Sequence, residues 1–226
     1  LSASIKSLKI DAENGGLPVR HISAEDIRVN VGIRTLLTGM LHFQHIQIKR
    51  PYVVLRSPAP PSETPKKTPA SSKPLHIRVD DLNIKQGHIE YRDQSAPIHA
   101  SLSRIRFDII FEAADKTHAG LFSAEKGNIL FQDNIVPVNH IHFPFHFDMN
   151  SFEFEDFHLD SDVLTLKAAG KINEYQKNPR FDVNFSAAVR TKNISETLNL
   201  GQPLRGTIHL EARLHSSPDA PRMEGN

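Results

Sequence analysis

Alternation of apolar and polar residues with a period of two is the feature of this sequence that most constrains its fold. In segment 207–214, for example, Ile208, Leu210 and Leu214 share a parity, and polar residues stand between them. The same pattern recurs at 27–31, 77–91, 105–109, 143–154, 164–167 and 183–185. Because successive side chains of a strand point to opposite faces, the pattern predicts strands with one apolar and one wet face. The sequence therefore predicts an all-β fold.

Helical signals are few and short. Segments 33–39 and 194–201 are each expected to form a brief helical turn that ends at a glycine, Gly39 or Gly201. The expected architecture is thus a long antiparallel meander. A change of parity between Phe43 and Ile46 predicts a bulge or bend near His45.

One segment, 57–74, differs from the rest in composition. It holds six of the 15 prolines and no Val, Ile, Leu, Met or Phe, so it cannot bury a core. We expect an extended, disordered insertion that separates N-terminal strands at 1–56 from the main part at 75–226. A tolerated insertion between strands is favoured over a proline motif that binds a partner.

Phenylalanine dominates the aromatic composition. The 226 residues include 13 Phe, three Tyr and no Trp, and six of the Phe lie between 143 and 157. A face rich in Phe has no polar groups that need partners. It suits the dry core of a β-sandwich, and it equally suits a surface that holds hydrocarbon chains.

Charge and motifs argue against several classes of function. The net charge of +1 argues against binding to a nucleic-acid backbone. The absence of Cys excludes disulfides, thiolate zinc sites and iron–sulfur clusters. No nucleophile elbow, phosphate-binding loop or zinc-protease motif is present, so we expect neither an enzyme nor a cofactor.

Several histidines and carboxylates stand close enough in the sequence to raise the question of a metal site. His140 and His142 share a strand face, but His146 lies about 13 Å from His142 in an extended strand, and Pro144 interrupts them. The alternating acidic run 156–162 lacks the tight glycine loop that calcium usually requires. Solvent-facing strand residues are the favoured interpretation of both groups, and no metal site is predicted.

Three segments resemble one family. Segment 33–56 resembles a unit of the AsmA-like superfamily: a short turn, a small-residue stop, a strand, a bend and then I-x-I-x-x-P-x-V-x-L. Segment 75–93 is similar to that family's strand pair, with Gly87 and Asp93 at the expected positions. Segment 203–225 resembles the repeat of TamB-type translocation and assembly proteins, with Ser where the repeat prefers Gly. Together they cover about a third of the chain.

The resemblance implies a fold, a location and a role. Members wrap their strands into a long open groove with an apolar lining, and an N-terminal helix, not part of this sequence, anchors them in the inner membrane. They extend across the periplasm and are thought to carry phospholipid acyl chains between the inner and outer membranes. An alternative role is support of outer-membrane protein assembly, with an outer-membrane β-barrel as partner. The resemblance brings no catalytic residue, no cofactor and no nucleic acid, and it suggests a segment near the N-terminal end of such a protein.

The full hypothesis is therefore an all-β antiparallel meander with few short helices, curled into an open apolar groove (β-taco-like). This groove would bind acyl chains non-covalently. The apolar positions predicted to line the groove are Ile27, Val29, Leu41, Phe43, Ile46, Ile48, Ile77, Val79, Leu82, Ile84, Ile89, Ile105, Phe107, Ile109, Phe143, Phe145, Phe147, Phe152 and Phe154. Two alternatives remain open. One is an assembly factor that pairs through exposed strand edges, including the strand at 206–214. The other is a plain β-sandwich interaction module.

Overall fold

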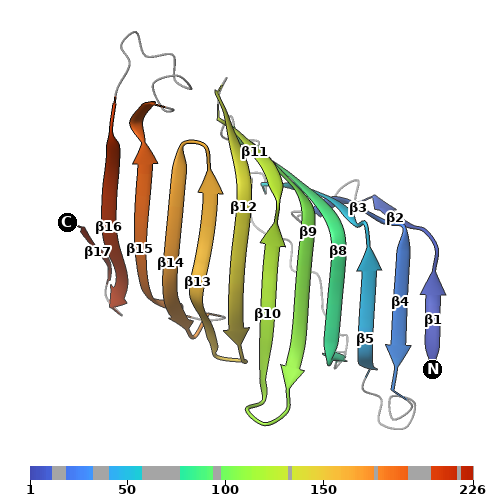
Figure 1. The fold of residues 1–226 in the computed structure, drawn as a ribbon. Coiled ribbons are helices and arrows are strands. Elements are labelled where there is room, and N and C mark those ends of the chain that lie inside the picture. The colour runs from blue at the N-terminus through green and yellow to red at the C-terminus, as the bar shows by residue number, and fades with distance from the viewer. Residues whose placement is uncertain are drawn as a thin grey trace, which may run out of the picture.

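Strands account for nearly all of the regular structure (Figure 1). The structure, a computed structural model, describes residues 1–11, 19–32, 41–57, 77–93, 98–131, 134–175, 178–192, 205–217 and 220–225. The strands are β1 (Ser2–Ile5), β2 (Leu8–Asp11), β3 (Val19–Ala24), β4 (Asp26–Val31), β5 (Leu41–Lys49), β6 (Tyr52–Arg56), β7 (Ile77–Val79), β8 (Asp81–Arg92), β9 (Ile98–Glu112), β10 (Thr117–Ala124), β11 (Lys126–Phe131), β12 (Asn134–Phe147), β13 (Ser151–Ser161), β14 (Leu164–Asn173), β15 (Arg180–Arg190), β16 (Thr207–Ser217) and β17 (Ala220–Gly225). The predicted all-β fold is confirmed.

Hydrogen bonds join these strands into one sheet. From β12 to β17 each strand pairs with the next one along the chain. Before β12, many positions in the sheet are filled by two short strands lying end to end. For example, β9 and β12 both pair with β10 along one half and with β11 along the other. Likewise β8 pairs with β5 along one half and with β6 along the other. Further out, β5 pairs with β4 and β4 with β1. In the other half, β6 pairs with β3 and β3 with β2. The described strands therefore form one sheet and not a two-sheet sandwich.

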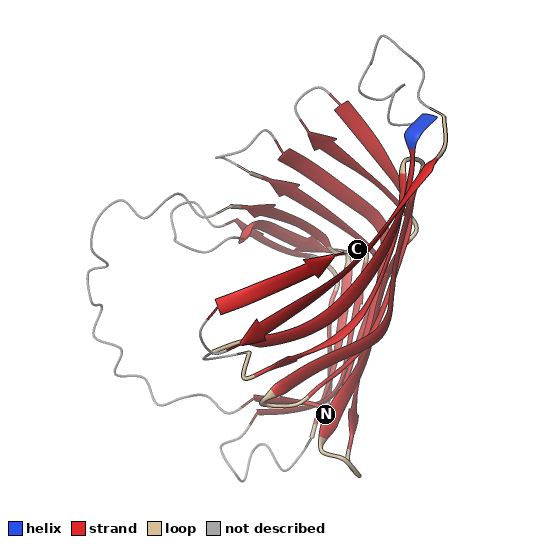
Figure 2. Ribbon diagram, turned by 90° about the vertical axis from the view of Figure 1, so that its left-hand side faces the viewer, coloured by secondary structure: helices blue, strands red, loops and turns tan. Residues whose placement is uncertain are grey.

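The breaks between these half-strands line up across the sheet. They fall at Lys6–Ser7, Glu25, Arg50–Pro51, Gln86–Gly87, Arg104, Glu125 and Asn139, and we call this row of residues the kink line. Register shows the alignment: Lys49 pairs with Lys85 before the line, and Tyr52 pairs with His88 after it. Figure 2 shows the resulting curvature, with strand ends from both halves projecting toward the same side.

Three residues on the kink line have a backbone conformation that is unusual for side chains other than glycine. Arg50, Gln86 and Arg104 have φ angles of 48°, 57° and 53°, in the left-handed region. They occupy neighbouring strand positions, so the strain is concentrated at one place in the sheet. Gly87 lies beside them, and a Cβ added there would come within 3.3 Å of both Ile105 Cβ and Pro51 Cγ. The inside of the corner is therefore tightly packed.

Each break also changes the parity of the alternation. On either side of Glu25, Ile22 and Ala24 belong to one parity and Ile27 to the other, yet all three line the same hollow. One extra residue in a strand resets which face the following side chains occupy. The apolar face therefore continues through the kink line on the inside of the bend. We call this the inner face and the opposite one the outer face.

The buried apolar residues are concentrated beside the kink line. Ile105, which is only 3% exposed, forms a core cluster with Ala124, Val138 and Ile141. On the outer side of the line, Glu25 pairs with Arg50, and Arg104 Nη1 lies 3.3 Å from Glu125 Oε2. Those pairs are solvent-exposed and contribute little to stability. The bend is held mainly from inside, by burial of the core cluster.

The kink line ends before the C-terminal strands. The last irregularity is a register shift in β13 between Phe154 and Phe157. Beyond it, β14 and β15 pair without interruption from Leu164 opposite Val189 to Asn173 opposite Arg180. The sheet thus has a kinked region, β1 to β12, and an unbroken region, β14 to β16.

The prediction of a purely antiparallel meander is wrong at one junction. β5 and β6 run parallel to β7 and β8, with Leu41 opposite Ile77 and Tyr52 opposite His88. Parallel neighbours need a connection of about a dozen residues or more that returns the chain to the starting end. Residues 58–76 make this connection, so the proline-rich segment joins two parallel strands rather than two strands of a hairpin.

Other local predictions have mixed outcomes. The bulge expected near His45 is confirmed, because the β4–β5 register jumps from Asn30 opposite His45 to Val31 opposite Phe43. The turns predicted at 33–39 and 194–201 lie outside the described residues, as does the insertion at 57–74 apart from Ser57.

Candidate functional site

Apolar side chains form continuous rows across the inner face. The row next to the kink line takes one residue from each of seven strands, paired in register: Ile5, Ile27, Ile48, Ile84, Phe107, Phe122 and Phe143. A second row on the other side of the line consists of Ile10, Ile22, Val53, Ile89 and Leu102. The two rows face each other across the inside of the bend.

Between these rows lies an apolar hollow of about 350 Å³. It is lined by Leu8, Ile22, Ala24, Ile27, Ile48, Pro51, Val53, Ile84, Gly87, His88, Ile89, Ile105, Phe107 and Phe122. His88 is the only ionisable residue among them, and its Nδ1 lies 2.8 Å from Ser103 Oγ. His88 has the opposite parity to Gly87 and Ile89, and its ring stacks on Tyr52 on the outer face. The other lining residues are apolar, which suits non-covalent binding of an apolar group.

The residues predicted to line a groove fall into four groups. Six of them line the hollow: Ile27, Ile48, Ile84, Ile89, Ile105 and Phe107. Four form the next row outward on the same face: Val29, Ile46, Leu82 and Ile109. Four pair with one another at the far end of β5 and β7: Leu41, Phe43, Ile77 and Val79. Of this last group, Leu41, Phe43 and Val79 do not line the hollow, and the side chain of Ile77 lies outside the part of the chain that the structure describes.

The remaining five predicted residues belong to an aromatic cluster. Phe143, Phe145, Phe147, Phe152 and Phe154 contact one another through their rings. Phe145 is 5% exposed and packs on Gly120, where an added Cβ would lie 2.3 Å from its ring. Phe145 therefore fills space in the cluster and does not line the hollow.

The prediction missed several lining residues, and the parity change explains some of them. Ile22 and Ala24 precede Glu25 and have the opposite parity to the predicted Ile27 and Val29 that follow it. Leu8 follows the break at Lys6–Ser7, in a strand for which no lining residue was predicted. Val53 stands in the run Val53–Val54–Leu55, where all residues are apolar and parity cannot be assigned. One-residue changes of parity at matching places in successive strands were the available signal.

Polar side chains cover the outer face behind the hollow. Tyr52 stacks on His88 with ring centroids 5.3 Å apart, and the two lie on adjacent strands. The Tyr52 hydroxyl, by hydrogen bonding to Glu90, lowers the pKa of that carboxyl below its ordinary value, and Arg92 and His88 add to the effect. Partial burial, and then this same hydrogen bond, raises the pKa of Tyr52. The outer face is thus wet and charged where the inner face is apolar.

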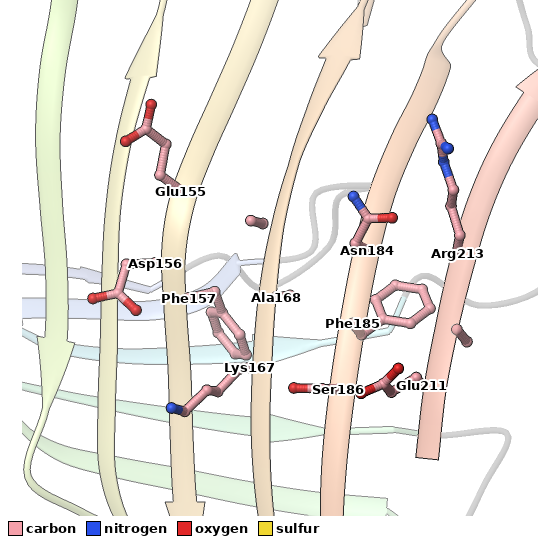
Figure 3. A pocket seen from close by; sticks show the side chains of 12 residues that line it. Glu155, Asp156, Phe157, Lys167, Ala168, Asn184, Phe185, Ser186, Glu211 and Arg213 are labelled. Atoms are coloured by element: carbon pink, nitrogen blue, oxygen red, sulfur yellow. The ribbon is translucent and has the colours of Figure 1, made fainter. Parts of the chain in front are cut away.

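A larger depression, of about 570 Å³, lies over the unbroken region (Figure 3). Its polar side chains form two lines across the strands, one with Lys167, Ser186 and Glu211 and one with Asn184 and Arg213. These residues alternate with the apolar residues of the inner face, so they belong to the outer face. Charges of both signs are mixed there, and Arg213 is already paired with Asp182 at 3.0 Å. The apolar hollow is the more distinctive feature.

Two further features are absent from the described ranges. Those residues contain no group of three or more His, Asp or Glu that could hold a metal ion. They also contain no helix that is long and apolar enough to cross a membrane. A comparison of the chain with protein-family models and with curated proteins found no match.

Proposed function

We propose that the inner face binds the hydrocarbon chains of lipids, with the apolar hollow at the kink line as its principal site. The observation that carries the proposal is the composition of the hollow, which is apolar from Leu8 in β2 to Phe122 in β10. Backbone donors and acceptors within a sheet are used by neighbouring strands. The hollow therefore suits an occupant without hydrogen-bonding groups, and each methylene removed from water contributes about 0.8 kcal/mol.

The wider role follows from the sequence resemblance to the AsmA-like superfamily. On that basis the chain is a segment of a periplasmic bridge-like protein, anchored to the inner membrane, that conducts phospholipid acyl chains between the inner and outer membranes. The inner-face rows would be part of the path, and headgroups would remain in water. A curved single sheet with one apolar face is the structural feature that supports this role.

Lipid extraction with mass spectrometry tests the proposal. Protein purified in mild detergent should retain phospholipid at a reproducible ratio. Ile27→Glu places a charge in the half-exposed lining of the hollow and should abolish retention, while Ile110→Glu places the same charge on the exposed outer face and should leave retention unchanged. Circular dichroism and denaturation would check that both variants fold. Folded wild-type protein that is free of lipid would overturn the proposal.

The edge of the sheet supports a second candidate function, assembly by strand addition. β17 pairs only with Ala212–Ser217 of β16, and no described strand pairs with Thr207–Glu211 on that side. Ile208 and Leu210 in this stretch are half exposed. An added strand could pair with the free edge. Leu210→Pro should block partner capture but spare lipid retention, which separates the two functions.

A further inference from the structure

The apolar hollow runs across the strands of the sheet. Its lining residues follow the kink line across successive strands, from Leu8 on β2 and Ile22 on β3 to Phe122 on β10. The path crosses β2, β3, β6, β8, β9 and β10, which are neighbours in the sheet. At about 4.8 Å between neighbouring strands, these five spacings amount to about 24 Å. An extended chain would therefore lie across the strands, along the inside of the bend.

Two aromatic rings lie at the β10 end of the hollow. Phe107 and Phe122 are the last lining residues, and their rings meet edge to face with centroids 6.4 Å apart. Beyond them the inner face continues into Phe143 and Phe145, which do not line the hollow.

The aromatic end is supported from behind. Phe107 stacks on Phe145 with centroids 6.0 Å apart, and Phe145 is buried against Gly120. Phe143 contacts Phe145, Phe152 and other rings of the cluster. Since protein interiors pack closely, a ring with such neighbours cannot swing aside without disturbing them. Phe107 in particular is fixed by the cluster.

The opposite end of the hollow is exposed. β1 and β2 form the margin of the sheet, and no described strand pairs with their outer edges. Ile5 and Ile10 are 46% and 50% exposed there, although they continue the two apolar rows. A hydrocarbon chain that follows the hollow would therefore have its tail at the aromatic end and its polar head near β1 and β2, in water.

We infer that Phe107 and Phe122 form an end wall that sets the length of hydrocarbon chain the hollow accepts. The inference rests on the proposed binding of hydrocarbon chains. A chain gains affinity with each methylene until its tail reaches the wall, and further methylenes remain in water. With about 0.8 kcal/mol per methylene, affinity should rise about fourfold per carbon up to this length and then level off.

A series of saturated fatty acids from octanoate to octadecanoate, used below their micelle concentrations, tests the wall. Displacement of a fluorescent fatty-acid probe would give the affinity of each acid for the protein. In the wild type, affinity should rise with chain length and then level off. Phe122→Ala should move the plateau to longer chains, and Phe122→Trp should move it to shorter ones.

Matched variants separate a wall from a loss of packing. Phe154→Ala also removes a ring from the aromatic cluster, but this residue does not line the hollow, so the plateau should stay in place. Ile22→Ala removes lining at the opposite end and should weaken all acids alike. If Phe122→Ala fails to fold, Phe122→Leu makes a smaller opening and should still shift the plateau toward longer chains.

The outcomes distinguish the inference from the function on which it rests. If no acid binds to the wild type, the proposed function fails. If acids bind but affinity rises through the whole series, or if the Phe122 variants keep the wild-type plateau, the wall is wrong and the binding function stands.

Discussion

The kinked and unbroken regions are built from the same alternating pattern but bury it to very different extents. In the kinked region Ile105 is 3% exposed, whereas in the unbroken region Ile208 and Leu210 are 50% and 51% exposed. Both regions place their apolar residues on the same face of one sheet. The difference is the row of extra residues at the kink line, which the unbroken strands lack.

The comparison shows how a single sheet acquires a core. An apolar sheet face must pack against a second layer, which is usually another sheet or a set of helices. At the kink line the sheet bends so that its two halves face one another, and one half supplies the second layer for the other. The parity change keeps apolar side chains on the inside of both halves. The unbroken region has no such partner layer among the described residues. Val183 in the middle strand β15 is only 7% exposed, but Ile208 and Leu210 in β16 stay half exposed.

Deletion of a kink-line residue should have the largest effect on stability. Deletion of Glu125 joins β10 to β11 without the extra residue, which would turn Gly127 and Ile129 to the outer face or force β11 out of register. Exposure of the Ile129 side chain alone costs about 1.5–3 kcal/mol, and the disturbed pairing of β11 with β9 and β12 adds to this cost. We expect a loss of about 4 kcal/mol or more in the free energy of unfolding, measured by urea denaturation.

A deletion in a turn provides the control. Asp115 lies in the turn between β9 and β10, outside the paired residues. Its removal should cost far less than removal of Glu125. Equal losses from the two deletions would mean that chain length alone matters and that the parity change does not.

Truncation of one apolar residue in each region gives the next largest effect. Ile105→Ala removes a buried side chain from the core cluster and should cost about 2–4 kcal/mol. Leu210→Ala removes a half-exposed side chain and should cost under about 1 kcal/mol. Chemical denaturation of both variants would measure the difference. Similar losses would show that the unbroken region also has a second layer in solution.

Glycine substitutions should have opposite signs in the two regions. Gln86 is exposed and has a φ of 57°, so Gln86→Gly relieves backbone strain and should stabilise the protein by about 0.5–1 kcal/mol. Lys167, in the unbroken β14, has no such strain, and Lys167→Gly should destabilise by about 0.5–1 kcal/mol. Thermal melts of the two variants should therefore shift in opposite directions. If Gln86→Gly instead lost stability, the left-handed conformation of Gln86 would not be a source of strain in the folded protein.

The smallest expected effect concerns acid and the parallel junction of the kinked region. Burial tends to raise the pKa of Asp80, but hydrogen bonds from Arg78 at 2.8 Å and His42 at 2.6 Å outweigh it and lower that pKa below its ordinary value. A carboxyl with a depressed pKa in the folded state contributes stability above its unfolded value, and this contribution is lost as pH falls through the folded value.

Hydrogen exchange would detect this effect. Amides of β7 and neighbouring β5 should exchange faster as the pH falls from about 5 to about 2, after correction for intrinsic rates, while those of β15 should change less. Asp80→Asn should remove the difference between the strands. An unchanged acid response in that variant would assign the effect to other carboxyls.

The sequence was sufficient for the fold class but not for the bend. Alternation in segments such as 207–214 identified strands directly, and β16 covers that segment. The bulge near His45 was visible because apolar residues on both sides of it are unambiguous. At Glu25, Arg50 and Glu125 the breaks are short, and alignment of the breaks across strands depends on pairing, which alternation alone does not specify. The parallel junction was missed for the same reason.

The candidate site was predicted only in part. Ile48 and Ile84, which line the hollow, were among the predicted residues because each lies in a short run of clear alternation. Phe145 was assigned to a lining, and the structure instead buries it on Gly120. Whether an aromatic residue lines a hollow or fills space behind it depends on which small residue lies opposite, and that contact joins two different strands.

The kink line has a consequence for how a chain of this kind can change in length. Each kinked strand consists of two stretches in opposite phase, and the residue at the kink line sets the phase difference. Gain or loss of two residues between the kink line and a turn preserves that phase, whereas gain or loss of one inverts every side chain beyond it. Natural or engineered length variants of strands β3 to β12 should therefore differ by even numbers within each half-strand, with odd changes confined to the turns.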